Sequence, residues 1–208
     1  MTSAARARSL TALAAAAVLS ACASTSETYP SRTATEQLLV ARAADRAVDG
    51  LTLPIPVGSK VFVDELYFRA ESAPYAVSAI RAALSEAGYF IAPSKTEADA
   101  VFEIRAGTLS LEQMRRVFGL PEMRVPINDS FNVVSLPELS VYSRRDRVGV
   151  AEFSGFLYEP KTGAPLGAVI PMTGEFNIRS HKLFMIIAWG QQRLSPGDRD
   201  PGDSWLQF

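Results

Sequence analysis

The sequence predicts an α/β (α+β) fold, a single mixed β-sheet with two main helices packed on it. Two segments in the first half of the chain have apolar residues at helical spacing. Short segments rich in β-branched and aromatic residues precede and follow the second of them, as is typical of strands. The resulting order α-β-α-β-β places helices on one or both faces of a mixed sheet.

The first helix is predicted to begin at Thr33. Thr33 and Glu36 have the spacing of a capping box, in which each side chain caps the other residue's backbone N–H. Five apolar residues then share one helical stripe: Val40, Ala44, Ala47, Val48 and Leu51. The Asp49-Gly50 pair and the prolines that follow it are expected to end the helix.

A strand, a second helix and two more strands are predicted next. Residues 58–68 predict the strand, and the helix is expected to begin at Pro74, where a missing N–H costs nothing, and to stop at Gly88. Its stripe comprises Val77, Ile80, Ala83, Leu84 and Ala87. Residues 89–92 predict a short strand, and residues 98–111 alternate as a longer one.

The middle of the chain is less regular. Between residues 112 and 136, three prolines and a polar stretch predict an extended excursion from the sheet. Residues 139–148 and 149–158 are then expected to form two successive strands.

The last part of the domain is predicted to be β-structure. Turn chemistry at residues 159–163 reverses the chain into strands at residues 166–170 and 174–179. The apolar run at residues 183–189 is either a fully buried strand or part of a buried helix, and its length favours the strand.

The N-terminus has the parts of a secretory signal peptide. Arg6 and Arg8 precede an alanine-rich apolar run at residues 10–19, and small residues lead to Cys22. The run is about ten residues long, well short of the ~20 that span a bilayer. Two alternatives remain open, a plain signal peptide with an incidental cysteine and a short membrane anchor. We expect residues 1–21 to be removed.

The segment Leu19-Ser20-Ala21-Cys22 resembles the bacterial lipobox. This resemblance implies that the thiol of Cys22 is diacylated, that cleavage occurs before it, and that its new amine is acylated. In such lipoproteins an aspartate after the cysteine causes retention at the inner membrane. Ala23 stands there instead, which implies the periplasmic face of the outer membrane.

The expected organisation after cleavage is a tether, a domain and a tail. Residues 22–32 are small and polar and predict a flexible lipidated tether. Residues 33–194 form one periplasmic domain, and residues 195–208, which repeat Pro-Gly-Asp, are expected to be disordered. Cleavage reduces the 21 basic residues to 19 against 22 acidic residues, a formal net charge of −3, so nucleic acid is not an expected partner.

No catalytic or metal-binding constellation is evident. His181 is the single histidine and Cys22 the single cysteine, too few for a zinc site or a catalytic triad, and we expect no cofactor and no metal. Two pairs of carboxylates are candidates for acid–base chemistry. Asp64 and Glu65 are adjacent on a predicted strand and so face opposite ways, whereas Glu152 and Glu175 lie in separate predicted strands that could approach each other. We therefore expect binding rather than catalysis.

Two segments are candidate partner-binding sites. The first combines charged and apolar residues in a predicted irregular region: Arg115, Arg116, Phe118 and Leu120. The interpretation we favour there is that Val117, Phe118 and Leu120 fold back into the core. The second is a basic run able to meet acidic head groups or an acidic partner: Arg144, Arg145 and Arg147. A charged hairpin tip is the more ordinary interpretation of that run.

The order of elements resembles that of a group of known lipoproteins. After the lipobox come TATEQLLVARAADRAVDGL, KVFVDEL, YAVSAIRAALSEAGY and ADAVFEI. This is similar to small outer-membrane lipoproteins of Gram-negative bacteria, namely the periplasmic modules of the curli secretion lipoprotein, the flagellar lipoproteins and the activators of penicillin-binding proteins. The resemblance covers residues 33–111 and implies a fold like the TolB N-terminal domain. Residues 136–167 resemble an uncharacterised family of such lipoproteins.

These features predict an outer-membrane-anchored lipoprotein that acts as a binding or assembly module for an envelope complex. The expected partners are the membrane, through the N-terminal lipid, and an envelope protein; a homo-oligomer is left open. One alternative is a lipid-handling auxiliary of a transporter with an apolar pocket lined by Phe184, Met185 and Ile187. Another is a cell-wall glycan hydrolase that uses paired carboxylates.

Overall fold

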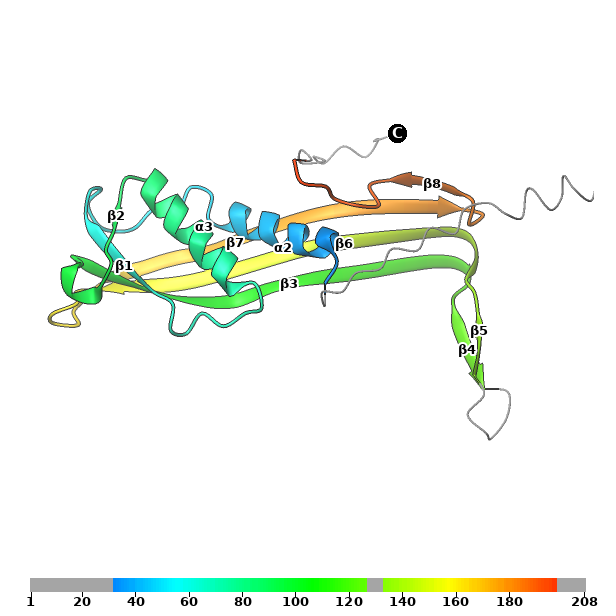
Figure 1. Ribbon diagram of the computed structural model, residues 1–208, viewed down its shortest axis with the longest axis horizontal. Coiled ribbons are helices and arrows are strands. Elements are labelled where there is room, and N and C mark those ends of the chain that lie inside the picture. The colour runs from blue at the N-terminus through cyan, green and yellow to red at the C-terminus, as the bar shows by residue number, and fades with distance from the viewer. Residues whose placement is uncertain (1–31, 127–132, 198–208) are drawn as a thin grey trace, which may run out of the picture. The chain divides into compact units, whose positions relative to one another are not determined.

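The computed structural model describes residues 32–126 and 133–197 (Figure 1). The predicted signal peptide, Cys22, nearly all of the tether and the C-terminal tail from residue 198 lie outside the described residues. None of the described helices has the length and hydropathy needed to span a membrane.

A mixed six-stranded sheet forms the body of the domain, as predicted. Its strands, in the spatial order β2-β1-β3-β6-β7-β8, are Phe90–Ile91, Lys60–Asp64, Ala100–Leu120, Leu139–Tyr158, Pro165–Leu183 and Ile187–Gly190. The β1 strand pairs in parallel with β2 and β3, and all other neighbours are antiparallel. The strand β1 is shorter than the predicted residues 58–68. The fold class predicted from the sequence is confirmed.

Two helices, α2 (Ala34–Ala47) and α3 (Ala73–Glu86), lie on the same side of the sheet (Figure 1). The predicted capping box is present: the Glu36 N–H donates to Thr33 Oγ1 at 3.3 Å, and the Thr33 N–H donates to Glu36 Oε2 at 2.9 Å. Pro74 occupies the first turn of α3, where it costs no hydrogen bond. A short 3₁₀ helix, η1 (Lys95–Glu97), precedes β3.

The hydrophobic core lies between the helices and the sheet. Its largest fully buried side chains include Phe102, Phe153, Leu39 and Ile80. The C-terminal part of the domain joins this core through Leu194, which is 4% exposed and whose N–H donates to Thr35 Oγ1 at 3.3 Å. The core therefore includes Leu194.

The long strands correct the predicted pattern in three places. Residues 112–120 continue β3 and are not part of an excursion, β6 is one strand where two were predicted, and β7 joins the two strands predicted at residues 166–170 and 174–179. The central strand β6 pairs with β3 on one side and with β7 on the other along almost all of its length. These strands therefore continue through segments whose side-chain pattern does not indicate a strand. Register shifts mark bulges within the ladder.

The irregular part of the middle region is a separate two-stranded ribbon, β4 (Met123–Pro126) with β5 (Val133–Leu136). It turns away from the large sheet where β3 ends and β6 begins (Figure 1). The predicted excursion is therefore correct only beyond residue 120.

The apolar run at residues 183–189 is not buried. The strand β7 ends at Leu183, a turn follows, and β8 begins at Ile187. Exposures are 56% for Phe184, 51% for Met185 and 86% for Ile186. The prediction of a buried strand or helix is wrong because a seven-residue apolar run does not distinguish a core strand from an exposed turn.

Candidate functional site

The strands β3, β6 and β7 continue past the end of α2, where neither of the two described α-helices covers them (Figure 1). We call this part the distal end, and we call its exposed apolar residues the apolar tip. The members of the apolar tip are between 43% and 86% exposed: Phe118, Leu120, Leu139, Val141, Phe184, Met185, Ile186 and Ile187. Contiguous exposed apolar residues mark interaction sites in soluble domains.

Strand register brings the apolar tip together from two hairpins. Leu120 lies opposite Leu139, where β3 and β6 leave the sheet. On the neighbouring hairpin, the Phe184 N–H donates to the carbonyl of Val141 at 2.8 Å. The turn after β7 is therefore joined directly to the strand that carries Leu139 and Val141.

The turn between β7 and β8 has an unusual backbone. Phe184 and Met185 both have positive φ, 48° and 62°, and the Ile186 N–H donates to the carbonyl of Leu183 at 3.2 Å. Such a turn normally has asparagine, aspartate or glycine at its two central positions, because larger side chains are strained there. Strained residues of this kind cluster at functional sites. The side chains of Phe184 and Met185 are more than half exposed and are not part of the hydrophobic core.

Three of the arginines near the apolar tip are paired with carboxylates. Asp146 Oδ2 accepts a hydrogen bond from Arg144 Nε at 2.8 Å, and its Oδ1 accepts one from Arg179 Nε at 2.7 Å. Burial raises the pKa of Asp146, but the hydrogen bonds from the two arginines outweigh burial and bring that pKa below its ordinary value. Arg115 forms an ion pair with Glu138.

The basic run at residues 144–147 is not at a hairpin tip. It lies within β6, with β3 on one side and β7 on the other: Arg145 is opposite Arg115 in β3 and Ser180 in β7. Because side chains alternate along a strand, Arg144 lies on one face of the sheet, and Arg145 and Arg147 lie on the other. The hairpin interpretation is wrong because the strand continues through the charged residues.

The first candidate segment, residues 115–120, does not fold back into the core as the sequence led us to expect. Phe118 is 71% exposed and Leu120 is 55% exposed, so these side chains do not fold back into the core. Arg115 and Arg116 are adjacent in β3 and lie on opposite faces of the sheet. The segment contributes Phe118 and Leu120 to the apolar tip, and its arginines are not one basic patch.

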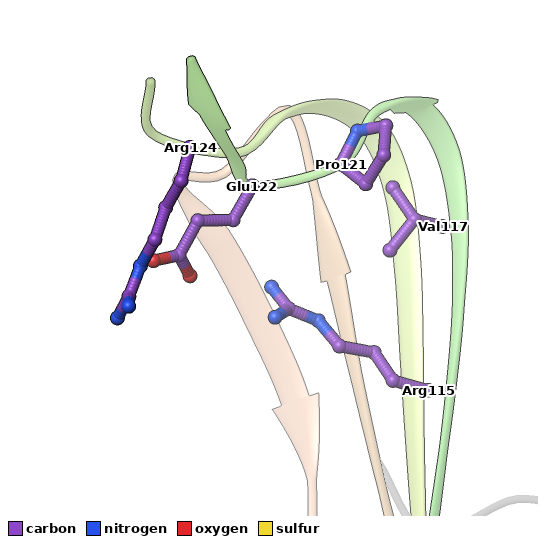
Figure 2. Close-up of a pocket in the computed structure, with 5 residues that line it drawn as sticks. All are labelled: Arg115, Val117, Pro121, Glu122 and Arg124. Atoms are coloured by element: carbon purple, nitrogen blue, oxygen red, sulfur yellow. The ribbon is translucent and has the colours of Figure 1, made fainter. Parts of the chain in front are cut away.

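Arg115 lines a pocket at the bend between β3 and the β4–β5 ribbon (Figure 2). The pocket has a volume of about 490 Å³ and is lined by Arg115, Val117, Pro121, Glu122 and Arg124. Figure 2 shows the Arg115 side chain and the Glu122 carboxylate pointing into the space enclosed by the bend. Its lining combines three charged side chains with the apolar Val117 and Pro121.

A polar aromatic cluster, which the sequence did not predict, lies beside the apolar tip. Tyr142 Oη is 2.8 Å from His181 Nδ1, and the His181 ring stacks on Trp189 with centroids 5.3 Å apart and an interplanar angle of 8°. The register explains the cluster. His181 lies opposite Arg144 in β6, two positions along the strand from Tyr142 and on the same face, and it lies opposite Trp189 in β8. Only the strand pairing reveals it.

We expect the pKa of His181 to lie below its ordinary value of about 6.5. Burial lowers this pKa most, and the charges of Arg144 and Arg179 lower it further against the charge of Asp146. The neutral ring is therefore favoured by folding. Its contribution to the free energy of unfolding is complete above pH ~6.5 and is lost as the pH falls toward the folded-state pKa.

His181 is the single histidine, so its imidazole NMR resonance can be followed without assignment through a pH titration. A midpoint below 6.5 is expected. Trp189→Ala removes the stacked ring that shields His181 and is expected to move the midpoint toward 6.5. A wild-type midpoint at or above 6.5 would contradict the placement of His181 in this cluster.

The residues named for the alternative functions are placed as follows. Asp64 is buried and accepts a hydrogen bond from Lys95 Nζ at 2.5 Å, whereas Glu152 and Glu175 are exposed in β6 and β7. Phe184, Met185 and Ile187 are each more than half exposed and so do not line a deep apolar cavity. Within residues 32–126 and 133–197, no group of three or more His, Cys, Asp or Glu side chains is placed to hold a metal ion.

The fold and the site define a single α/β domain with an exposed apolar surface at one end of its sheet. The chain belongs to a family of unknown function, DUF6655, whose model matches residues 16–179. The match includes Cys22 and the strands β3 and β6, and it ends within β7, before the turn at Phe184. No curated protein matches the chain.

Proposed function

We propose that the protein is an outer-membrane-anchored periplasmic lipoprotein that acts as a binding module for an envelope protein complex, with the apolar tip as its contact surface. The observation that carries the proposal is the apolar tip itself. Phe118 and Ile186 are 71% and 86% exposed, at the ends of two neighbouring hairpins. Leaving such side chains in water is unfavourable, and a partner that covers them gains about 25 cal/mol for each Å² of apolar surface removed from water.

The charges around the apolar tip favour a protein partner over an anionic lipid surface. A lipid surface is recognised by unpaired basic side chains. Arg144 and Arg179 are instead held by Asp146, and Arg115 by Glu138. These three arginines share two carboxylates, so part of the positive charge beside the apolar patch is neutralised, as at the polar rim of protein–protein interfaces.

The proposed lipid anchor gives the domain access to envelope partners. If Cys22 holds the lipid, residues 23–32 separate it from Thr33, where the folded domain begins. A fully extended chain of ten residues spans at most ~35 Å, so the domain remains close to the membrane surface. Confinement of this kind raises the effective concentration of a partner in the same membrane.

The contact surface is tested with a photoreactive phenylalanine analogue placed at Phe184 in living cells. Phe90 is the matched control, since it is an aromatic residue of similar exposure, 63%, in β2 at the other end of the sheet. We expect discrete crosslinked protein bands from position 184 and none of these bands from position 90. The same bands from both positions, or crosslinks from position 184 to lipid alone, would overturn the proposal of a protein partner.

The anchor is tested separately by mass spectrometry of the membrane-bound protein. The expected N-terminal residue is Cys22, carrying acyl groups on its sulfur and amine, and Cys22→Ser is expected to release the protein from the membrane fraction. An unmodified Cys22, or a mature protein that retains residues 1–21, would disprove lipidation. This result leaves the contact surface to be judged by the crosslinking experiment alone.

A further inference from the structure

The distal half of β3 has one edge that pairs with no other described strand. On that side β3 pairs with β1, and this pairing covers only Ala100–Glu103 of β3. From Arg105 to Leu120, no other described strand pairs with this edge, and Figure 1 shows β3 along the margin of the sheet there. An unpaired strand edge presents backbone N–H and C=O groups that are able to pair with another chain.

The opposite margin of the sheet is formed by β7 and, beside residues 180–183, by β8, and it is better protected than the edge of β3. Pro171 has no N–H to offer, Arg46 Nη1 donates to the carbonyl of Glu175 at 2.5 Å, and the Gln191 N–H donates to the carbonyl of Arg179 at 2.8 Å. These are ordinary ways in which proteins prevent edge-to-edge association. Between residues 108 and 120, β3 has no proline, and none of the described residues is seen to cap its carbonyls.

We propose that this edge binds the same edge of a second copy of the chain, in antiparallel pairing with Met114 opposite the partner's Met114. The free edge has natural limits. A bulge lies between Ala106 and Thr108, and the strand ends at Leu120. Met114 is the midpoint of residues 108–120, so a two-fold axis through this residue pairs the whole regular edge with itself.

Charge complementarity selects this register. Glu112 comes opposite the partner's Arg116, and the two-fold axis repeats the pair. Opposite charges directly across two antiparallel strands are favourable, and like charges are unfavourable. In the part of the chain that the structure describes, Glu112 has no ion-pair partner, and Arg116 contacts the sulfur of Met114 at 3.5 Å. Both charges are thus available to a second copy.

None of the remaining pairs places like charges opposite each other. Leu111 comes opposite the partner's Val117 on the helix-bearing face, and Ser110 comes opposite the partner's Phe118 on the other face. Neighbouring registers are worse: a centre at Arg115 places this residue opposite itself, and a centre at Gln113 places Glu112 opposite the partner's Met114. A two-fold axis normal to the sheet keeps the helices of both copies on one face, so the sheet continues across the dimer.

The register is tested by cysteine crosslinking of the full chain in a Cys22→Ser background, where each introduced cysteine is the single thiol. Met114→Cys is expected to form a covalent dimer with a short bis-maleimide. Ser110→Cys and Phe118→Cys are each expected to give none alone, because two copies of either position are far apart along the strands. A mixture of these two variants is expected to crosslink. Equal crosslinking of all three variants alone would overturn the register.

Charge reversal gives an independent test with a built-in rescue. Glu112→Arg and Arg116→Glu each place like charges across the two-fold axis twice, and each is expected to weaken dimerisation about tenfold in sedimentation equilibrium. The double variant restores both pairs and is expected to restore dimerisation. A wild-type chain that sediments as a monomer at all concentrations, or a double variant as weak as the single ones, would disprove the dimer. The outcome does not depend on the proposed function.

Discussion

Replacing Gly174 with valine is expected to reduce the free energy of unfolding by about 3 kcal/mol. Gly174 lies in β7 directly beneath α2. A Cβ atom added at this position would lie 2.2 Å from the carbonyl oxygen of Ala43 and 2.4 Å from the backbone nitrogen of Ala47. Both are helix backbone atoms, which cannot rotate away as a side chain can, so relief requires that the whole helix shift and lose its packing on the sheet.

The measurement is urea unfolding followed by circular dichroism, with Thr173→Val as the matched control. Thr173 is the preceding residue of the same strand and is exposed on the opposite face, so a valine there meets no helix. The control is expected to stay within about 0.5 kcal/mol of wild type, as surface substitutions usually do. If the two variants were equally stable, α2 would not sit on the sheet through Gly174.

A second glycine, Gly149 in β6, has the same role under the same helix. Its added Cβ would lie 2.2 Å from the carbonyl oxygen of Leu39. The two glycines thus allow the helix to approach two neighbouring strands closely, and they determine which part of the sheet is covered. This coverage ends before the distal end, which explains why α2 does not cover the apolar tip (Figure 1).

The helices were predictable from the sequence because their signals are local. The Thr33–Glu36 capping box, the Pro74 start and the apolar stripes all lie within one or two turns of the residues they affect. The fold class followed from the order of such local signals. The closeness of Gly149 and Gly174 to α2 was not predictable, because it depends on the pairing of β6 with β7.

The long strands were harder to predict because their distal halves are uncovered. Around Arg115 and Arg145 both faces are largely accessible, so the alternation of apolar and polar residues that indicates a strand is lost. The strand continues there because its backbone is paired with β6, and such pairing leaves no trace in the side-chain pattern.

The candidate site was predictable in part. Phe118 and Leu120 were singled out, although burial was the favoured interpretation, and both belong to the apolar tip. The turn at Phe184 and Met185 was misjudged because apolar residues at positive φ contradict ordinary turn chemistry. Local rules fail at functional or strained sites more often than elsewhere, and the positive φ values of Phe184 and Met185 mark this turn as a strained site.

The same turn supports the second large prediction, in which stability and binding change in opposite directions. Replacing Phe184 and Met185 with Asn-Gly gives the turn the residues that its backbone favours. Relief of two strained positions is expected to raise the free energy of unfolding by about 1–2 kcal/mol, measured by urea unfolding. The same variant loses two side chains of the apolar tip, and crosslinking to the envelope partner from a photoreactive residue at position 118 is expected to disappear.

Ile186→Ser separates the two effects, because Ile186 is 86% exposed and has no positive φ to relieve. It is expected to reduce crosslinking while leaving the free energy of unfolding within about 0.5 kcal/mol of wild type. An Asn-Gly variant that is less stable than wild type would show that Phe184 and Met185 serve the fold. A variant that is more stable and still crosslinks fully would remove the turn from the contact surface. Gained stability with lost binding is the outcome expected where a protein retains strained residues for the sake of a partner.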